Sequence, residues 1–364
     1  MKLSAARDVL LKPLQAVIGV VERRQTMPIL SNILLVAKNN ELSVTATDLE
    51  VELVAQAEVT VETGGEITVS GRKLLDICRA LPEGSTVDIS VSGEKVVVRS
   101  GRSKFSLATL PAAEFPSVED IKAGQVIEVE QAVLGQLIEK THFSMAQQDV
   151  RYYLNGMLLE TGGKHLRAVA TDGHRLALCQ AELSAAVDEQ QVIVPRKGVL
   201  ELQRLMSGEG SLNIELGPNH VRIQLEGIRF TSKLIDGRFP EYDRVIPKES
   251  SNELTADRAA FKGALQRTAI LSNEKYRGIR LIIRDSGVVM QAHNPEQEEA
   301  EEELEVEYNG EDIEIGFNVN YLLDALGAVE GDDVTLSVLD GNSSCLIRQP
   351  GNDASKFVVM PMRL

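Results

Sequence analysis

The chain repeats two patterns of apolar and polar positions at a nearly constant spacing. Apolar residues three and four positions apart predict amphipathic helices, and alternating β-branched residues between turn signals such as Asp236-Gly237 predict short strands. The helices are expected in two sets of three, at 5–24, 131–148 and 257–272, and at 71–81, 196–207 and 318–329. Pro13 lies inside the first of them and is expected to kink or interrupt it.

Short motifs mark matching positions in each copy of this pattern. A strand pair ends in Ala46-Thr47-Asp48, Ala170-Thr171-Asp172 and Ala292-His293-Asn294, and a last strand leads to proline at 105–116, 230–240 and 357–361. Recurrence of ordered landmarks indicates an internal repeat. We therefore predict an α+β chain of three repeated domains, each with two helices and antiparallel sheet, at 1–125, 126–252 and 253–364.

Charge is unevenly spread over this pattern. The 364-residue chain has a formal net charge of −16, yet its six predicted helices together carry a net positive charge. Dispersed Lys and Arg attract the phosphate backbone without reading base edges. For any single helix an ordinary solvated face is the simpler explanation, but the sum over the repeats makes the helices candidates for a sequence-independent DNA surface.

The sequence offers no catalytic or metal-binding constellation. The histidines are scattered without metal-ligand spacing, and neither a phosphate-binding loop nor a nucleophile elbow occurs. Cys78, Cys179 and Cys345 lie far apart and are expected to be buried and reduced. No apolar run is long enough to cross a membrane. We expect a cytoplasmic protein that is not an enzyme and needs no cofactor or metal.

The acidic run at 296–307 has two readings. It is either a solvated face or a charged edge strand that pairs with a basic edge, and Arg99, Arg102 and Lys104 lie on such a segment in the first repeat. Joining repeat one of one chain to repeat three of another would close a ring if the rotation permits, and would otherwise give filaments.

Several longer motifs resemble the bacterial DNA polymerase III beta subunit, the beta sliding clamp, from end to end. They are Thr26-Met27-Pro28-Ile29-Leu30, the segment 148–157, Ala170-Thr171-Asp172-Gly173-His174-Arg175-Leu176, Asp236-Gly237-Arg238-Phe239-Pro240, the segment 294–302 and the terminal 358–364. The resemblance implies a homodimer whose six domains form a ring around duplex DNA, with helices lining the hole. Such a ring is a processivity factor and catalyses nothing itself. Because the chain has no nucleotide site, another protein is expected to open it.

The resemblance also implies a hydrophobic groove that holds short segments of the replicative polymerase alpha subunit, the clamp loader delta subunit and other proteins with clamp-binding motifs. Carried over by position, the groove comprises Leu154, Thr171, Gly173, His174, Arg175, Leu176, Pro240, Arg244, Val245, Tyr276, Asn318, Tyr321, Ser344, Met360, Pro361, Met362 and Arg363. Flexible Met and Leu side chains suit a surface with several partners. Tyr276 and Asn342 stand where relatives carry phenylalanine and valine, which makes the rim more polar.

Two further surfaces follow from the resemblance. The DNA surface comprises Arg24, Arg72, Gln148, Tyr152, Tyr153 and Lys197. The dimer edge comprises Lys73, Arg102, Lys104, Phe105, Leu107, Ile270, Leu271, Glu298, Glu299, Glu301 and Glu302. The apolar members are expected to dominate the dimer contact, because exposed ion pairs contribute only about 0–1 kcal/mol each.

Two rival functions fit the residues less closely. An acidic, repeat-built scaffold would be monomeric and indifferent to charge reversal of Arg24, Arg72 and Lys197. A hydrolase would use the turn at Asp172 and His174, which is more simply a structural turn.

Overall fold

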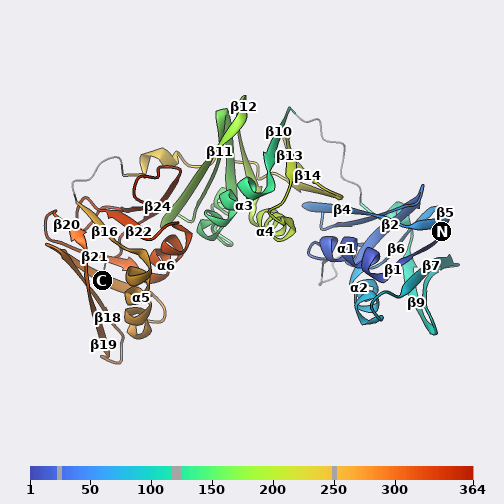
Figure 1. Ribbon diagram of the computed structural model, residues 1–364, viewed down its shortest axis with the longest axis horizontal. Coiled ribbons are helices and arrows are strands. Elements are labelled where there is room, and N and C mark those ends of the chain that lie inside the picture. The colour runs from blue at the N-terminus through green and yellow to red at the C-terminus, as the bar shows by residue number, and fades with distance from the viewer. Residues whose placement is uncertain (23–26, 117–123, 248–251, 364) are drawn as a thin grey trace. The chain divides into compact units, whose positions relative to one another are not determined.

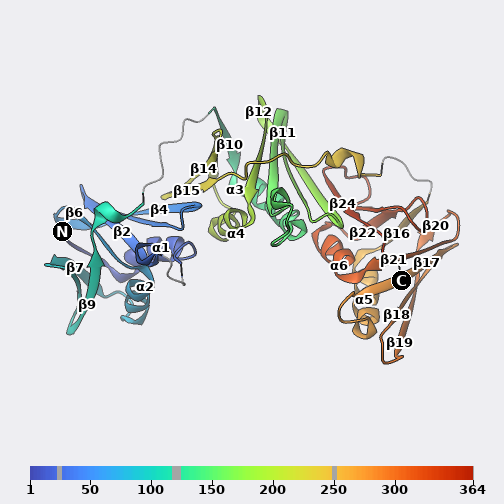
Figure 2. The same cartoon turned by 180° about the vertical axis from the view of Figure 1, so that it is seen from behind.

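The computed structural model describes residues 1–22, 27–116, 124–247 and 252–363. By its contacts the chain divides into two compact units, Met1–Ala132 with Leu200–Leu234, and Val133–Val199 with Ile235–Leu364 (Figures 1 and 2). Two helices, α3 (Gln131–Glu139) and α4 (Arg196–Leu205), run across the division. Among the described helices, none is long and apolar enough to span a membrane.

The first unit is built on one antiparallel sheet that strands from two predicted domains share. Its order is β10-β13-β14-β15-β4-β3-β2-β6-β9-β8-β7-β1-β5. The strands are β1 (Lys2–Ala6), β2 (Asn32–Lys38), β3 (Glu41–Thr47), β4 (Val51–Glu58), β5 (Thr60–Thr63), β6 (Gly65–Ser70), β7 (Thr86–Ser92), β8 (Lys95–Ser100), β9 (Ser103–Leu110), β10 (Gln125–Glu130), β13 (Ser211–Leu216), β14 (His220–Leu225) and β15 (Ile228–Lys233). The pairing of β15 with β4 joins central residues to the first repeat, so the unit boundary falls inside the predicted central domain. The three domain ranges remain a prediction.

Two helices pack side by side against this sheet (Figure 1). They are α1 (Arg7–Val17) and α2 (Gly71–Ala80), and short 3-10 turns lie at Pro28–Ser31 and Ala112–Glu114. In α2 the buried Leu74, Leu75 and Cys78 recur at helical spacing, as its apolar stripe predicts. Pro13 does not interrupt α1, which continues to Val17 and ends well short of the predicted residue 24.

The second unit has two antiparallel sheets, β11-β12-β24-β23-β22-β16-β20 and β19-β18-β17-β21. Their strands are β11 (Gly156–Thr171), β12 (Arg175–Pro195), β16 (Glu253–Asp257), β17 (Gly278–Arg284), β18 (Gly287–His293), β19 (Glu299–Glu305), β20 (Glu307–Tyr308), β21 (Ile313–Asn318), β22 (Asp333–Ser337), β23 (Cys345–Arg348) and β24 (Ser355–Val359). Helices α5 (Arg258–Thr268) and α6 (Val319–Ala328) pack against one another. Phe261 and Leu265 of α5, Leu322 of α6 and Phe317 of β21 are buried in the same core. Short 3-10 turns lie at His142–Ser144, Tyr152–Leu154, Tyr242–Arg244 and Ala269–Leu271.

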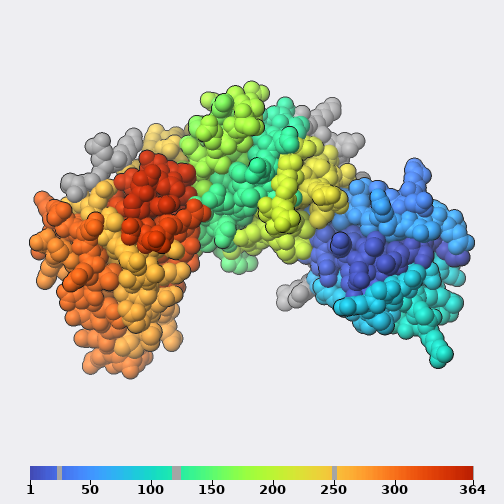
Figure 3. Space-filling view, in the orientation of Figure 1, coloured from blue at the N-terminus to red at the C-terminus, as the bar shows by residue number. Residues whose placement is uncertain are grey.

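The repeat is visible in how each unit joins two copies of it. Phe230 of β15 lies opposite Leu53 of β4, and Phe357 of β24 lies opposite Ala177 of β12. The backbone continues alike beyond both pairs, since Lys233 N donates to Glu50 O at 2.8 Å and Met360 N donates to His174 O at 2.9 Å. In Figure 3 the red C-terminal residues share one surface with the orange residues of the third repeat. A strand of the last repeat thus completes a sheet of the central one.

The two predicted charged edges are real strand edges. β19 ends its sheet and pairs only with β18 in the described chain, and its exposed side chains are glutamates at alternate positions. β9 pairs with β8 along its length, but with β6 only at Thr109 and Leu110. The stretch Ser103–Ala108 therefore has one side without a strand partner among the described residues.

Candidate functional site

A four-bond turn between β11 and β12 forms one rim of the site. The Thr171 hydroxyl donates to Arg175 O at 2.6 Å and accepts from Gly173 N at 3.1 Å. Asp172 Oδ1 accepts from His174 N and Arg175 N at 2.9 and 3.1 Å. Gly173 has φ +88°, a left-handed conformation that glycine adopts without steric cost. The turn is therefore structural, and Asp172 is occupied by backbone donors.

The first repeat carries the same turn at 47–51. Thr47 and Asp48 make the four equivalent hydrogen bonds, but Leu49 replaces the glycine at φ +76°. Glu52, which is 6% exposed, stands at the position of Leu176. An apolar floor is thus absent from this copy of the turn.

The loop 148–155 is fixed by a carboxylate clamp. Asp149 Oδ1 accepts from Arg151 N and Nε at 2.8 and 3.0 Å, and Asp149 Oδ2 accepts from Arg151 Nη2 at 2.8 Å. These hydrogen bonds lower the pKa of Asp149 to about 2. Asn155 pairs with both the amide and the carbonyl of Asp149 at 2.9 Å. Arg151 then reaches Asp172 O at 3.2 Å, so the loop and the turn are held together.

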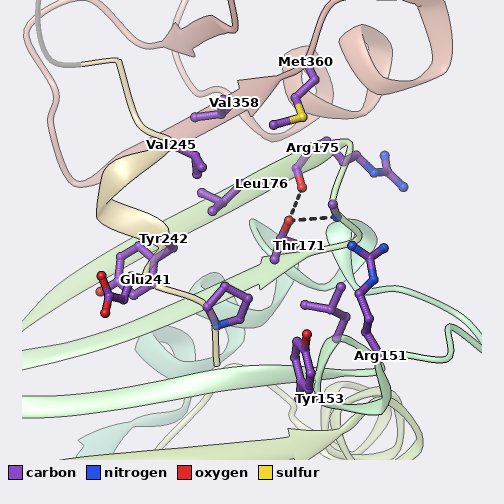
Figure 4. A pocket seen from close by; sticks show the side chains of 13 residues that line it. Arg151, Tyr153, Thr171, Arg175, Leu176, Glu241, Tyr242, Val245, Val358 and Met360 are labelled. Atoms are coloured by element: carbon purple, nitrogen blue, oxygen red, sulfur yellow. Dashed lines mark hydrogen bonds between the residues drawn. The ribbon is translucent and has the colours of Figure 1, made fainter. Parts of the chain in front are cut away.

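Between these elements lies a pocket of about 190 Å³ (Figure 4). Its lining is mostly apolar, with one arginine from the loop and one from the turn at the rim. The lining residues are Arg151, Tyr153, Leu154, Thr171, Gly173, Arg175, Leu176, Pro240, Glu241, Tyr242, Val245, Val358 and Met360. Such a pocket suits aliphatic or aromatic side chains of a peptide rather than a charged metabolite.

Tyr242 forms a wall of the pocket and is anchored from behind. Its hydroxyl donates to Glu160 Oε1 at 3.0 Å and accepts from Arg167 Nη1 at 2.7 Å, while Arg167 also pairs with Glu160 at 2.8 Å. Burial raises the pKa of Tyr242 to about 12, and the Arg167 hydrogen bond opposes part of that rise. The hydroxyl therefore stays protonated at neutral pH and keeps donating to Glu160.

The C-terminal tail closes another side of the pocket. Beyond the Met360 bond to His174, Met362 N donates to Gly316 O of β21 at 2.8 Å. Val358 and Met360 point to the pocket in Figure 4, as alternate residues of an extended chain do. The residues of the pocket thus come from distant parts of the sequence.

The predicted groove residues fall into two sets. Eight line the pocket, namely Leu154, Thr171, Gly173, Arg175, Leu176, Pro240, Val245 and Met360. The others lie outside its lining, namely His174, Arg244, Tyr276, Asn318, Tyr321, Ser344, Pro361, Met362 and Arg363. Of these, Asn318 caps α6 by accepting from Asn320 N, and Tyr276 is 56% exposed beneath the Lys275 ammonium.

Four of the lining residues were in none of the sites predicted from the sequence, and Tyr153 was predicted to lie on the DNA surface. The four are Arg151, Glu241, Tyr242 and Val358. Val358 could have been found from its spacing of two from Met360. The others enter through tertiary contacts that no local pattern signals.

The predicted DNA residues are spread over the described chain, except Arg24, which lies outside the described residues. Lys197 is exposed in the first turn of α4, and Gln148 is exposed with φ +56°. Tyr152 is 56% exposed, with its ring edge-to-face with Tyr153 at 5.8 Å. Arg72 is half-buried and donates to Val21 O at 3.2 Å, so part of its guanidinium stabilises its own fold.

The predicted dimer residues lie on the two open edges and beside them. Lys73, Arg102, Lys104, Glu298, Glu299 and Glu301 are exposed, and Phe105, Leu107 and Leu271 are half-buried. Ile270 is 75% exposed, which is unusual for an isoleucine in an ordered turn. Glu302 already pairs with Arg267 at 2.7 Å, which lowers the pKa of its carboxyl.

No group of three His, Cys, Asp or Glu side chains in the described ranges is arranged to hold a metal ion. Burial raises the pKa of Cys78 to about 11 and that of Cys345 to about 12, and it raises the pKa of Cys179 as well. These thiols are consequently poor nucleophiles at neutral pH.

Comparison with known proteins gives a consistent answer. Family models of the N-terminal, central and C-terminal domains of the DNA polymerase III beta subunit match residues 1–119, 128–241 and 243–363. The beta sliding clamps of Pseudomonas putida and Escherichia coli K12 are 55% and 50% identical to the chain, over 100% of both sequences in each case. The crystal structure of the DNA polymerase III subunit beta from Pseudomonas aeruginosa covers 100% of both chains with a TM-score of 0.98 and 53% identity. A griselimycin-bound sliding clamp from the same organism matches over 100% of both chains with a TM-score of 0.97 and 54% identity.

Proposed function

The chain belongs to the DNA polymerase III beta subunit family, and from this premise we propose that it closes as a homodimeric ring around duplex DNA and holds its partners by short peptide segments. Its function is that of a DNA sliding clamp, a processivity factor rather than a catalytic subunit, and it works with DNA and a polymerase. The ring would comprise six domains, three from each chain with the ranges 1–125, 126–252 and 253–364. We expect it to act in the cytoplasm, where bacterial DNA is replicated.

The repeated pairing register supports a specific dimer contact. In each unit one residue pairs with a neighbour on both sides of its strand. Leu53 faces Ala46 of the first Ala-Thr-Asp tripeptide and Phe230 of the second repeat. Ala177 faces Ala170 of the second tripeptide and Phe357 of the third repeat. In the third repeat the residue facing Ala292 is Ala300. By the same rule Ala300 of β19 would face Phe105 of the partner's β9.

This register fixes the neighbouring pairs of the proposed junction. In an antiparallel ladder Lys104 would face Glu301, Ser103 would face Glu302, and Leu107 would face Glu298. The exposed Ile270 would be covered in the same contact. Opposite charges then meet along two edges that lack partners in the described chain, which is a head-to-tail contact of the kind that closes rings.

The pocket is the observation that carries the partner-binding proposal. It is apolar, preformed and bordered by the flexible Met360, so it fits a short motif with hydrophobic anchors. The partners would be the replicative polymerase alpha subunit, the clamp loader delta subunit and other proteins with clamp-binding motifs. The griselimycin-bound relative supports the presence of a ligand site in the family.

For DNA, the proposed contacts are Arg24, Arg72, Gln148, Tyr152, Tyr153 and Lys197. Exposed cations such as Lys197 would contact phosphates without base specificity, and the exposed Tyr152 ring offers a face for stacking. Weak contacts of this kind suit a ring that must slide, since topology retains it on DNA.

Ring formation is tested by measuring the solution mass and imaging the same sample by electron microscopy. We expect a mass of two chains and a six-lobed ring with an open centre. A monomer at working concentrations would contradict the ring.

The register is tested by charge exchange. Lys104→Glu should weaken the dimer about tenfold or more, because two junctions each lose up to about 1 kcal/mol and gain a repulsion. Adding Glu301→Lys in the same chain should restore it, while Lys38→Glu on the distant end of β2 should have no effect. Failure of the second exchange to rescue the first would contradict the proposed register.

A further inference from the structure

Arg175 is a groove residue whose three guanidinium nitrogens each have a partner outside the pocket. Its Nε donates to Asp172 Oδ2 at 3.1 Å, its Nη2 to Phe143 O at 2.6 Å, and its Nη1 to Asp324 Oδ2 of α6 at 2.5 Å. The guanidinium also lies 4.4 Å from the ring centroid of Tyr321, another α6 residue. The side chain is only 13% exposed.

This geometry assigns Arg175 a different task from binding a partner's carboxylate. In Figure 4 its guanidinium points away from Leu176 and Val245. A new acidic partner would have to displace Asp172 or Asp324, at the cost of a charge-assisted hydrogen bond. The pocket therefore meets the aliphatic part of Arg175, while the charged end ties the turn to α6.

The turn in question sets much of the groove. Arg175 begins β12, its carbonyl accepts from Thr171, and the preceding carbonyl of His174 accepts from Met360 N. Thr171, Leu176 and Met360 all line the pocket. A displacement of Arg175 consequently moves the rim, the floor and the tail together.

We propose that Asp324 and Tyr321 are positioning residues for partner affinity, because they hold Arg175 and through it the groove. Neither residue lines the pocket. The inference rests on the proposed partner-binding function and adds to it a dependence on α6, an element of the third repeat. If α6 affects peptide affinity through the groove turn, a bound peptide should in turn affect α6, since coupling between two sites is reciprocal.

A neighbouring ion pair provides a matched control. Asp324 and Phe143 also border a separate hollow of about 270 Å³, together with Lys140 and Glu330. Lys140 is buried and pairs with Glu330 at 3.0 Å, and hydrogen bonds from Gln136 and Lys140 lower the pKa of the Glu330 carboxyl. Breaking this pair disturbs the contact between the residues that follow α3 and those that follow α6, without touching Arg175.

The test uses the full dimeric protein and a fluorescein-labelled synthetic peptide bearing the clamp-binding segment of a replicative polymerase alpha subunit. Anisotropy titration should show Asp324→Asn binding about two- to fivefold more weakly than wild type, the range expected for an ion pair whose carboxylate is half-exposed. Asp324→Glu, which keeps the charge, should recover most of the affinity. Glu330→Gln should bind as wild type does.

A double-mutant cycle separates positioning from general destabilisation. In an Arg175→Ala background Asp324→Asn should have no further effect, because its action passes through the missing guanidinium. If that background does not fold, Tyr321→Leu serves as the background instead, and Asp324→Asn should then lose less affinity than it does in the wild type, because both residues act through Arg175. Peptide binding should also slow amide exchange in 319–328, and Asp324→Asn should abolish that protection.

Three results would overturn the inference. They are wild-type affinity in Asp324→Asn, an equal loss in the Arg175→Ala background, and an equal loss in Glu330→Gln. Absence of peptide binding by the wild-type dimer is a distinct result, since it refutes the groove itself.

Discussion

Replacing Gly173 with alanine should weaken partner binding by more than it weakens the fold. An L-residue in the left-handed region costs about 1–2 kcal/mol, and Gly173 has φ +88°. A Cβ at this position would also lie 2.8 Å from Nη1 and 2.9 Å from Nη2 of Arg151. That guanidinium must therefore move, and its hydrogen bond to Asp172 O is lost.

The magnitudes differ for the two measurements. Arg151 is exposed, so its displacement adds little to the unfolding free energy, which should fall by the strain of about 1–2 kcal/mol. The groove loses a fixed lining residue and gains a methyl group, and overpacking of this kind costs about 1–3 kcal/mol. We expect peptide affinity to fall about tenfold, which corresponds to about 1.4 kcal/mol.

The matched control is Gly163→Ala in β11. Gly163 has φ +57°, and a Cβ there would meet nothing within 4 Å. It should lose about the same stability, from strain alone, and keep wild-type peptide affinity. Denaturant unfolding and fluorescence anisotropy on both variants measure the two quantities. Equal losses of affinity in the two variants, or none in Gly173→Ala, would refute this account of the turn.

Three further predictions concern the tail, the groove wall and the DNA surface. Deleting 360–364 removes the Met360 bond to His174 and should abolish peptide binding with the dimer mass unchanged; unaltered peptide affinity would exclude the tail from the groove. Because the pKa of Tyr242 is raised from 10.0 to about 12, the native state keeps the phenol proton up to a higher pH than the unfolded chain does. The resulting stabilisation is complete below pH 10 and lost by about pH 12, and Tyr242→Phe should lack this loss when unfolding and phenolate absorbance are followed against pH. The logarithm of DNA affinity falls linearly with the logarithm of salt concentration, and Lys197→Glu should reduce the magnitude of this slope by about one or more. Lys38→Glu is the control, and an unchanged slope in Lys197→Glu would remove Lys197 from the DNA surface.

The repeat architecture could be read from the sequence because its landmarks are local. The Ala-Thr-Asp tripeptide encodes its own turn, since the Thr and Asp side chains satisfy backbone groups two to four residues away. Periodicity likewise gave the start of α2, α4, α5 and α6 to within a residue. Structural features that depend on contacts within a few residues could therefore be predicted from the sequence.

The end of α1 shows why other features were not. Its last carbonyls, at Gln15 and Ala16, accept from the Arg204 guanidinium at 3.0 and 2.5 Å, so a residue of the central repeat terminates the helix. A side chain at Gly19 would collide with the Glu201 carboxylate. Neither contact can be predicted from the pattern of apolar and polar residues around residue 17.

The wall of the pocket also depends on contacts between residues that are distant in sequence. Tyr242 is positioned by Arg167 and Glu160, two residues of β11 far away in sequence, and the family resemblance supplied only part of the lining. The resemblance also grouped Tyr276 and Ser344 with the groove, whereas the pocket lining does not include them.

The place of β24 has a consequence for synthesis of the protein. Residues 355–359 complete the edge of β12, and Met360 closes the pocket, yet a ribosome adds these residues only after the whole stretch 196–354. Because domains fold from the N-terminus as the chain emerges, the central repeat must wait with one sheet edge open until the third repeat has been translated through β24. A product that stops before residue 355 would have an aggregation-prone edge and no groove, so only chains that include β24 and Met360 could compete for the polymerase.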